Sequence, residues 1–288
     1  MRFSTCISTG LLLLALSVAG GTAFAATKLV TNCEKNAAPL NGGYCVTKTQ
    51  GSTNQDVLYY FHGRGLNESA WLDDTYYTAQ LRQQWDETRE QAPIVVSISF
   101  GKDWILAQKN QSPYSGLFEV FIQGLLPKIE TSLGGVKGRR LLLGESMGGF
   151  NSIQMALKTT LFEKVAILCA PIAEISPFSP TAEVEAYIRR TNADRSLVLE
   201  LLEMGKAFFP TTRDWQTASP LALAREYKKA SAPEFYLAAG YYDGYGLYSG
   251  NAKFGEILRR SGATINWRPQ WGGHCAIDIE SLARFLTH

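Results

Sequence analysis

Histidine is scarce in this chain, with only three among 288 residues, at positions 62, 274 and 288. The charge is nearly balanced, with 28 basic and 26 acidic residues, and there is no long run of either sign. The chain therefore lacks the basic field that attracts nucleic acid. After the first 25 residues no segment has about 18 continuous apolar residues, so we expect no membrane span in the mature chain.

The N-terminus carries the features of an export signal. Arg2 precedes the apolar run LLLLALSV (11–18), and the small-x-small sequence AFA (23–25) follows it. Residues 1–25 are therefore predicted to be a signal peptide that is cleaved after Ala25. A membrane anchor is the alternative, but the apolar run is short for a bilayer span. We expect the mature protein to be exported, either to the periplasm or as a secreted protein.

Cysteine is also rare, and four remain after the predicted cleavage: Cys33, Cys45, Cys169 and Cys275. Cysteines of an exported protein are candidates for disulfides, and four of them allow three pairings. Cys33 and Cys45 enclose a short loop rich in turn-forming residues, and we favour that bridge. The other two cysteines then either pair or stay free. The sequence shows no CxxC spacing and no other metal-ligand cluster, so we expect neither a metal nor a cofactor.

Strand-like apolar runs alternate with longer segments of helical spacing. This alternation predicts one α/β domain over residues 26–288, with a mostly parallel central sheet and helices on both faces. Residues 44–50 are expected to begin the sheet as an antiparallel edge strand. The predicted strands are 57–61, 94–100, 139–144, 164–170, 234–240 and 263–269, and the predicted helices are about 73–90, 116–133, 147–159, 251–261 and 276–287.

The interval 171–233 breaks this alternation, because it has helical patterns but no convincing strand. Short helices are predicted within 182–190, 195–209 and 219–230. Two interpretations remain open. The interval is either an extra packing layer or a small helical cap inserted over the carboxyl edge of the sheet.

The stretch LLLGESMGGF (141–150) contains a serine turn between an apolar strand and a helical pattern. Its pentapeptide GESMG fits G-x-S-x-G in the strand–turn–helix context of a nucleophile elbow. The residues two before and two after the serine must be small, because strand and helix backbones nearly touch there, and both are glycines. The sequence therefore predicts Ser146 as an exposed nucleophile at the carboxyl edge of the sheet.

A serine hydroxyl needs a general base to attack at neutral pH, and the three histidines allow a choice by elimination. His288 is the last residue and is expected to fray. His62 belongs to an HG turn after the first central strand. His274, in WGGHCAIDI, follows the last strand, where the chain order Ser, Asp/Glu, His places the base. We therefore predict His274 as the base.

Asp243 is the predicted acid that orients His274 and stabilises its charged form. It lies in the loop YYDGYG, separated by two residues from the end of a predicted strand, and its alternative role is an Asx turn. Asp278 is the main rival, but it falls inside the predicted last helix. Glu174 and Asp214 come from the interval 171–233 and are less favoured.

The oxyanion of an acyl-transfer intermediate needs two backbone N–H donors. Met147, directly after the nucleophile, is predicted to supply one. The loop FHGRG (61–65) is predicted to supply the other, through the N–H of Arg64. The Arg64 side chain is expected to face water, with contact to a substrate carboxylate as the alternative.

Together, FHGRG, GESMGG, YYDG and GGHC resemble motifs of the α/β-hydrolase superfamily. The closer resemblance is to the esterase D-like branch, with its S-formylglutathione hydrolases, enterochelin esterases and feruloyl-type esterases. The resemblance covers residues 44–287 approximately. It implies an α/β-hydrolase fold and a serine carboxylic-ester hydrolase with Ser146 as nucleophile, His274 as base and Asp243 as acid.

These residues predict an exported serine carboxylesterase that hydrolyses small-molecule or polymer-linked esters through an acyl-enzyme. A serine peptidase of the prolyl-oligopeptidase type is the first alternative, but it usually carries a large extra domain for which this chain has no room. A non-catalytic binding protein with a hydrolase fold is the second, and the complete set of triad residues argues against it.

Aromatic residues crowd the predicted carboxyl edge. As a set they favour an apolar or aromatic ester, because rings beside a catalytic site can form an acyl or aryl pocket. They are Trp104, Tyr241, Tyr242, Tyr245, Tyr248 and Trp271.

Overall fold

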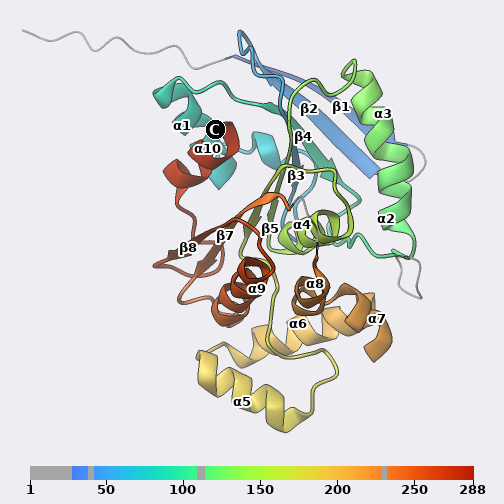
Figure 1. Cartoon of the computed structure of the whole chain (residues 1–288), viewed down its shortest axis with the longest axis vertical. Helices are drawn as coiled ribbons and strands as arrows, with labels where there is room; N and C mark the ends of the chain where they lie inside the picture. Colours follow the sequence, from blue (N-terminus) through green and yellow to red (C-terminus); the bar gives the residue numbers. More distant parts are fainter. Residues whose placement is uncertain (1–27, 38–41, 109–113, 229–231) are drawn as a thin grey trace, which may run out of the picture.

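The computed structural model describes residues 28–37, 42–108, 114–228 and 232–288 (Figure 1). The predicted signal peptide, residues 1–25, lies outside these ranges. None of the helices in the described ranges has the length and apolarity needed to cross a membrane.

The core of the fold is an eight-stranded sheet in the order β1-β2-β4-β3-β5-β6-β7-β8. β1 and β2 pair antiparallel, as do β2 and β4, and every pair from β4 to β8 is parallel. The predicted mostly parallel sheet is therefore confirmed. The strands are β1 (Leu29–Ala37), β2 (Gly42–Thr49), β3 (Val57–Phe61), β4 (Ile94–Ser99), β5 (Arg140–Glu145), β6 (Lys164–Leu168), β7 (Glu234–Gly240) and β8 (Ile265–Gln270).

The edge of the sheet differs from the prediction. β2 is the expected antiparallel strand, but β1 pairs with its outer side and forms the actual edge of the sheet. The sequence of β1, LVTNCEKNA, is mainly polar and has little of the apolar periodicity that marks a strand. An edge strand exposes much of its surface to water, so its side chains need not be apolar.

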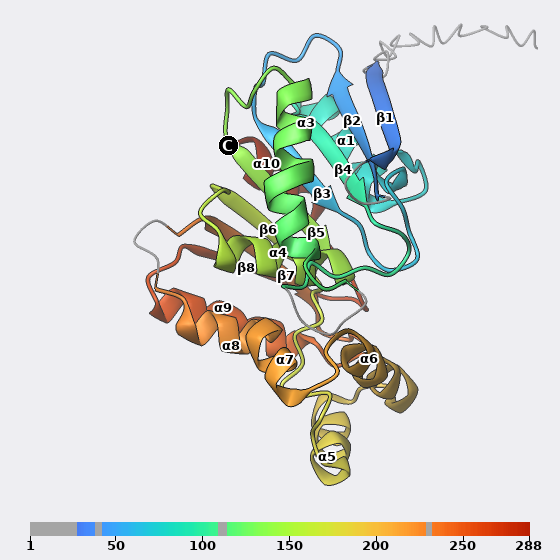
Figure 2. The ribbon, with the colours of Figure 1, turned by 90° about the vertical axis from the view of Figure 1, so that its right-hand side faces the viewer.

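Helices cover both faces of the sheet (Figures 1 and 2). Along β3, Tyr59 and Phe61 enter one core, while Leu58 and Tyr60 enter another, because successive side chains of a strand point to opposite faces. The first core contains residues of α2 (Leu117–Val120), a π-helical turn (Phe121–Leu125), α3 (Leu126–Ser132), α4 (Met147–Lys158), α8 (Pro220–Glu226) and α9 (Tyr248–Arg260). The second contains residues of the 3-10 helix Ala70–Leu72, α1 (Tyr77–Thr88) and α10 (Ile279–Thr287).

The interval 171–233 is helical and divides into two parts. α5 (Thr181–Thr191) and α6 (Arg195–Phe208) lie at one end of the molecule (Figures 1 and 2) and share a small core of their own. α7 (Thr212–Ala218), which the sequence did not predict, and α8 pack instead against the main core, through Trp215 and Leu221. The interval therefore includes both a packing layer and a projecting helical pair.

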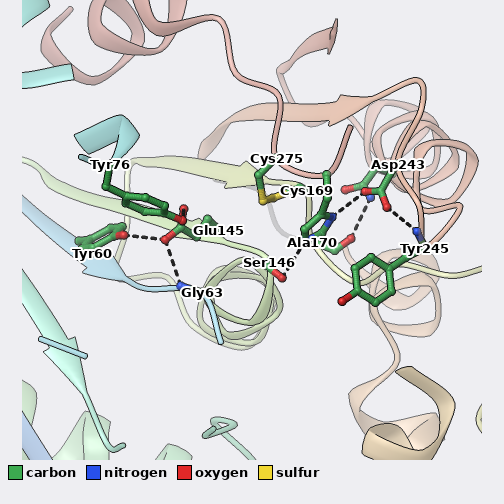
Figure 3. The surroundings of a disulfide bond; sticks show 12 residues. Tyr60, Gly63, Tyr76, Glu145, Ser146, Cys169, Ala170, Asp243, Tyr245 and Cys275 are labelled. Atoms are coloured by element: carbon green, nitrogen blue, oxygen red, sulfur yellow. Dashed lines mark hydrogen bonds and ion pairs between the residues drawn. A yellow bond between two sulfur atoms is a disulfide. The ribbon is translucent and has the colours of Figure 1, made fainter. Parts of the chain in front are cut away.

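Both cysteine pairs are disulfides in the structure. The predicted Cys33–Cys45 bridge is confirmed, and it joins directly paired residues of β1 and β2 rather than closing an irregular loop. Cys169 and Cys275, whose state the sequence left open, are also joined. The second bridge connects the residue after β6 to the loop between β8 and α10 (Figure 3).

Candidate active site

Ser146 occupies a sharp turn between β5 and α4. Its backbone has φ 49° and ψ −116°, a conformation that non-glycine residues adopt only under constraint. A Cβ on Gly144 would lie 2.2 Å from the carbonyl oxygen of Gly148, and one on Gly148 would lie 1.9 Å from that of Phe61. These close approaches explain why the turn needs glycine on both sides of the serine.

The structure brings Ser146, His274 and Asp243 together (Figure 3 shows Ser146 and Asp243). His274 Nε2 lies 3.1 Å from Ser146 Oγ, and His274 Nδ1 lies 2.8 Å from Asp243 Oδ2. In the Nδ1–H tautomer, the ring donates to Asp243 and accepts from the serine hydroxyl. This is the arrangement that a nucleophile, a base and an orienting acid require. The Asp243 side chain is fully buried, and its Oδ1 accepts the N–H of Tyr245.

The acidic residues that compete with Asp243 in the sequence lie elsewhere in the structure. Among the acidic rivals, Asp278 caps α10, Glu174 pairs with Arg190 and Lys253, and Asp214, in the first turn of α7, accepts the hydroxyl of the N-cap residue Thr211. The side chain of Asp243 also forms the Asx turn that was its alternative role, so one carboxylate serves both contacts.

The other two histidines have different partners. His62 is buried, with Nδ1 2.7 Å from the Gly63 carbonyl and Nε2 2.8 Å from Ser99 Oγ, and burial lowers its pKa. His288 lies 3.5 Å from Glu90. Within the part of the chain that the structure describes, neither forms a hydrogen bond or ion pair with Ser146.

The two predicted oxyanion donors line the same cavity as Ser146 and His274. Met147 begins α4, where the first N–H groups have no intrahelical acceptor. In the other loop, Gly63 N–H donates to Glu145 and Gly65 N–H donates to Lys102, at 3.0 and 2.9 Å. The Arg64 N–H between them has no protein acceptor among the described residues, so it is available to a substrate oxygen.

The Arg64 side chain does not simply face water. Its Nε lies 2.8 Å from Asp103 and its Nη1 2.5 Å from Glu200 of α6, while 44% of the side chain stays exposed. The guanidinium therefore pairs with two carboxylates, and the hydrogen bond that it donates to Glu200 is the main cause that raises its pKa further. The prediction that the Arg64 side chain faces water is therefore only partly right, because the side chain also pairs with Glu200 of α6.

The cavity at Ser146 is mainly apolar, and helices of the interval 171–233 contribute much of its wall. Its charged residues, Arg64 and Asp103, are paired with each other. An uncharged apolar group fits such a lining better than a charged one. The apolar wall includes Ile105, Met147, Phe150, Pro171, Ile175, Pro177, Leu201, Leu202, Met204, Phe208, Phe209, Trp215 and Leu247.

Of the six aromatic residues expected near the site, only Tyr245 lines this cavity. Trp104 is fully buried and donates its ring N–H to His62. Tyr242 and Trp271 are 69% and 79% exposed, and they form a surface cluster with Tyr241. The aromatic pocket was therefore the wrong interpretation for most of the set, because proximity in sequence to catalytic loops does not fix the direction of a side chain.

Glu145 is a site residue that sequence reasoning missed. It is completely buried, accepts hydrogen bonds from Tyr60 and Tyr76 at 2.6 and 2.7 Å, and accepts the N–H of Gly63 (Figure 3). Burial raises the pKa of its carboxyl. The contact with Gly63 ties the loop 61–65 to the serine turn. The sequence pattern that indicates this buried acid is an acidic residue placed directly between an apolar strand and the serine.

One group of potential metal ligands occurs in the described residues: Cys169, His274 and Cys275, whose ligand atoms lie within 4.8 Å of one another. Both sulfurs are joined in a disulfide, and a disulfide sulfur is not the thiolate that binds metals. The oxidised site therefore does not fit a metal ion.

Comparison with known proteins points to one family. Residues 44–261 match the family model "Esterase", described as "Putative esterase". No curated protein matches the chain.

Several solved structures share the fold. A ferulic acid esterase aligns over 91% of this chain and 94% of its own, with 19% identity and a TM-score of 0.62. An S-formylglutathione hydrolase from Agrobacterium tumefaciens aligns over 93% of this chain and 94% of its own, with 16% identity and a TM-score of 0.62. Brefeldin A esterase, a bacterial homologue of human hormone sensitive lipase, aligns over 96% of this chain and 80% of its own, with 16% identity and a TM-score of 0.66. At these identities the likeness establishes the fold, and the predicted α/β-hydrolase fold is confirmed.

Proposed function

Since the chain belongs to the esterase family and is an ester hydrolase, we propose that it is a serine carboxylesterase whose catalytic triad is Ser146, His274 and Asp243. The observation that carries this proposal is the pair of hydrogen bonds that link the three side chains, at 3.1 and 2.8 Å. The strained serine backbone and the available amide of Arg64 support it further.

In the proposed mechanism, Ser146 Oγ attacks the ester carbonyl while His274 Nε2 takes the hydroxyl proton. Asp243 stabilises the resulting imidazolium. The N–H groups of Met147 and Arg64 donate to the oxyanion. The tetrahedral intermediate collapses, the imidazolium protonates the leaving alcohol, and an acyl-enzyme remains. Water then gives a proton to His274 and attacks the acyl carbon. When this second tetrahedral intermediate collapses, His274 returns the proton to Ser146 Oγ, and the acid is released.

We infer that the apolar cavity holds the acyl group. Its walls bury apolar surface, and its charges are already paired, so an uncharged acyl chain or ring gains the most from entering it. The alcohol, small or polymer-linked, is then directed to solvent. Two disulfides and the N-terminal apolar run support an exported enzyme, because disulfides persist in oxidising compartments.

The decisive experiment replaces Ser146 by alanine and assays a short p-nitrophenyl ester. We expect kcat to fall by about 10³-fold or more, since the nucleophile is lost. Ser152→Ala is the matched control, because Ser152 lies on the same helix and its hydroxyl has no hydrogen-bond partner in the described part of the chain. Retained activity in folded Ser146→Ala would exclude the proposed nucleophile.

Two further measurements separate the alternatives. A peptidase would hydrolyse peptide p-nitroanilides well above the background of Ser146→Ala, whereas we expect hydrolysis of esters and no hydrolysis of these amides above that background. A non-catalytic binding protein would leave Ser146 unlabelled by a fluorophosphonate probe, whereas we expect labelling of the native chain and none of Ser146→Ala.

A further inference from the structure

We propose that the Cys169–Cys275 disulfide positions His274 for catalysis. The proposal rests on the function proposed above for His274. Cys275 is the next residue after His274, and Cys169 follows the last residue of β6, Leu168. The Leu168 carbonyl accepts the N–H of Ser146 at 2.9 Å. The disulfide therefore connects the loop of the base to the strand end that supports the nucleophile (Figure 3).

The loop that carries His274 has few other restraints. It connects β8 to α10 without regular structure. The Gly272 carbonyl accepts the N–H of Tyr242 at 2.9 Å, and the Gly273 carbonyl accepts that of Ala276 at 3.2 Å. No backbone hydrogen bond of His274 itself occurs within the described ranges, and 29% of its side chain is exposed. A covalent bond one residue away therefore restrains the backbone that carries the ring, beside the hydrogen bonds of the ring itself with Asp243 and Ser146.

The inner end of the bridge is firmly held. Cys169 is 1% exposed, belongs to the core on the α1 and α10 face of the sheet, and donates its N–H to Ala238 at 2.7 Å. Cys275 is partly buried and packs against the same core. A buried, hydrogen-bonded anchor on one side and a surface loop on the other are what a positioning tether requires.

The backbone conformations agree with a constrained site. Five non-glycine residues of the described ranges have positive φ. Arg89 and Asn192 are helix C-caps, where that conformation is ordinary. The other three are Ser146, Cys169 and Cys275, with φ of 49°, 44° and 59°. Such conformations persist where the surroundings hold them, and they concentrate at functional sites.

A purely global stabilising role is the competing explanation, and the chain contains its own control. The Cys33–Cys45 bridge joins β1 and β2 at the far edge of the sheet from β8. Removing it also removes one disulfide, but it touches neither the base nor the nucleophile. Comparing C169S/C275S with C33S/C45S therefore separates positioning from stabilisation.

We expect C169S/C275S to lose kcat by about tenfold or more, with KM for a short ester changed less than twofold, at a temperature where circular dichroism shows it folded. The rate of Ser146 phosphonylation by a fluorophosphonate should fall in parallel, because that reaction needs the same base. C33S/C45S should keep both rates within about twofold of the native enzyme. Equal kcat and phosphonylation rates in the two folded variants would overturn the proposal.

A second measurement applies if C169S/C275S does not fold. Folded C33S/C45S, which retains only this bridge, is treated with a thiol reductant, and maleimide labelling counts the freed thiols. We expect activity to fall as the thiols appear, with unchanged circular dichroism, and to return on reoxidation. Full activity with both thiols free refutes positioning. Ser146→Ala in the same background tests the triad separately: its inactivity preserves the proposed function even when the tether fails.

Discussion

Glu145 is a buried acid that accepts hydrogen bonds from two tyrosine hydroxyls and one backbone amide, and it forms no ion pair with a described residue. Tyr60 and Tyr76 donate their hydroxyls to this carboxyl group, and burial raises the pKa of both tyrosines further above neutral pH. Burial raises the pKa of Glu145 despite these hydrogen bonds. The native protein therefore holds this proton more tightly than the unfolded chain does.

The raised pKa of Glu145 determines how the free energy of unfolding changes with pH. As pH rises from the usual carboxyl pKa through the raised one, the unfolded chain binds fewer protons than the native protein, so the free energy of unfolding falls. Glu145→Gln cannot titrate. We expect its free energy of unfolding, measured in urea from pH 5 to 8, to decline less with pH than that of the native chain. Parallel curves for the two proteins would show that burial does not control this carboxyl.

At the scale of elements, α6 closes the apolar cavity over the serine turn. Leu201 lines the cavity, whereas Glu203 on the same helix is exposed. The Arg64–Glu200 ion pair holds α6 to the loop 61–65. Exposed ion pairs contribute little stability, so the apolar packing of α6 is expected to matter more for the wall.

Leu201→Trp tests whether this wall contacts the acyl group. The larger ring should exclude the distal methylenes of an octanoyl ester, each worth about 0.8 kcal/mol of burial, while an acetyl group still fits. We expect kcat/KM for the octanoyl ester to fall about tenfold or more and that for the acetyl ester to change less than threefold. Glu203→Trp is the control and should leave both values unchanged. Equal losses for the two esters in Leu201→Trp would place the acyl group elsewhere.

Across the whole molecule, the two disulfides restrain very different lengths of chain. The cysteines are 12 positions apart in one and 106 in the other. In the chain-entropy treatment, a loop of about 15 residues gives about 3 kcal/mol and one of about 100 residues gives about 4.7 kcal/mol. The longer loop spans β6 to α10, and so includes all the helices of the interval 171–233.

We therefore expect C33S/C45S to lower the free energy of unfolding by about 2–3 kcal/mol, and C169S/C275S to lower it by more, about 4–5 kcal/mol. Urea unfolding of both variants measures these losses. The native protein in excess reductant should approach the sum of the two losses, since the bridges lie in different parts of the sheet. A larger loss of unfolding free energy in C33S/C45S than in C169S/C275S would contradict this order.

The central sheet and the favoured positions of the candidate triad could be predicted because they depend on local patterns, although acidic rivals to Asp243 remained. β3 and β7 begin and end where the apolar runs at 57–61 and 234–240 do, since a strand covered on both faces is apolar throughout. Asp243 and His274 follow parallel strands, whose carboxyl ends meet at one edge. β1 was missed because its surface position leaves its sequence polar.

The amino-acid sequence by itself determined the serine turn, the strands that lead to it and the order of the candidate triad. Glycine spacing and apolar runs are enforced by contacts within a few residues. Only the tertiary structure decided which carboxylate reaches His274, that Cys169 and Cys275 are joined, that Glu145 is buried, and that α6 rather than the exposed aromatic rings lines the cavity. Each of these depends on side-chain directions and on contacts between distant segments, which no local pattern records.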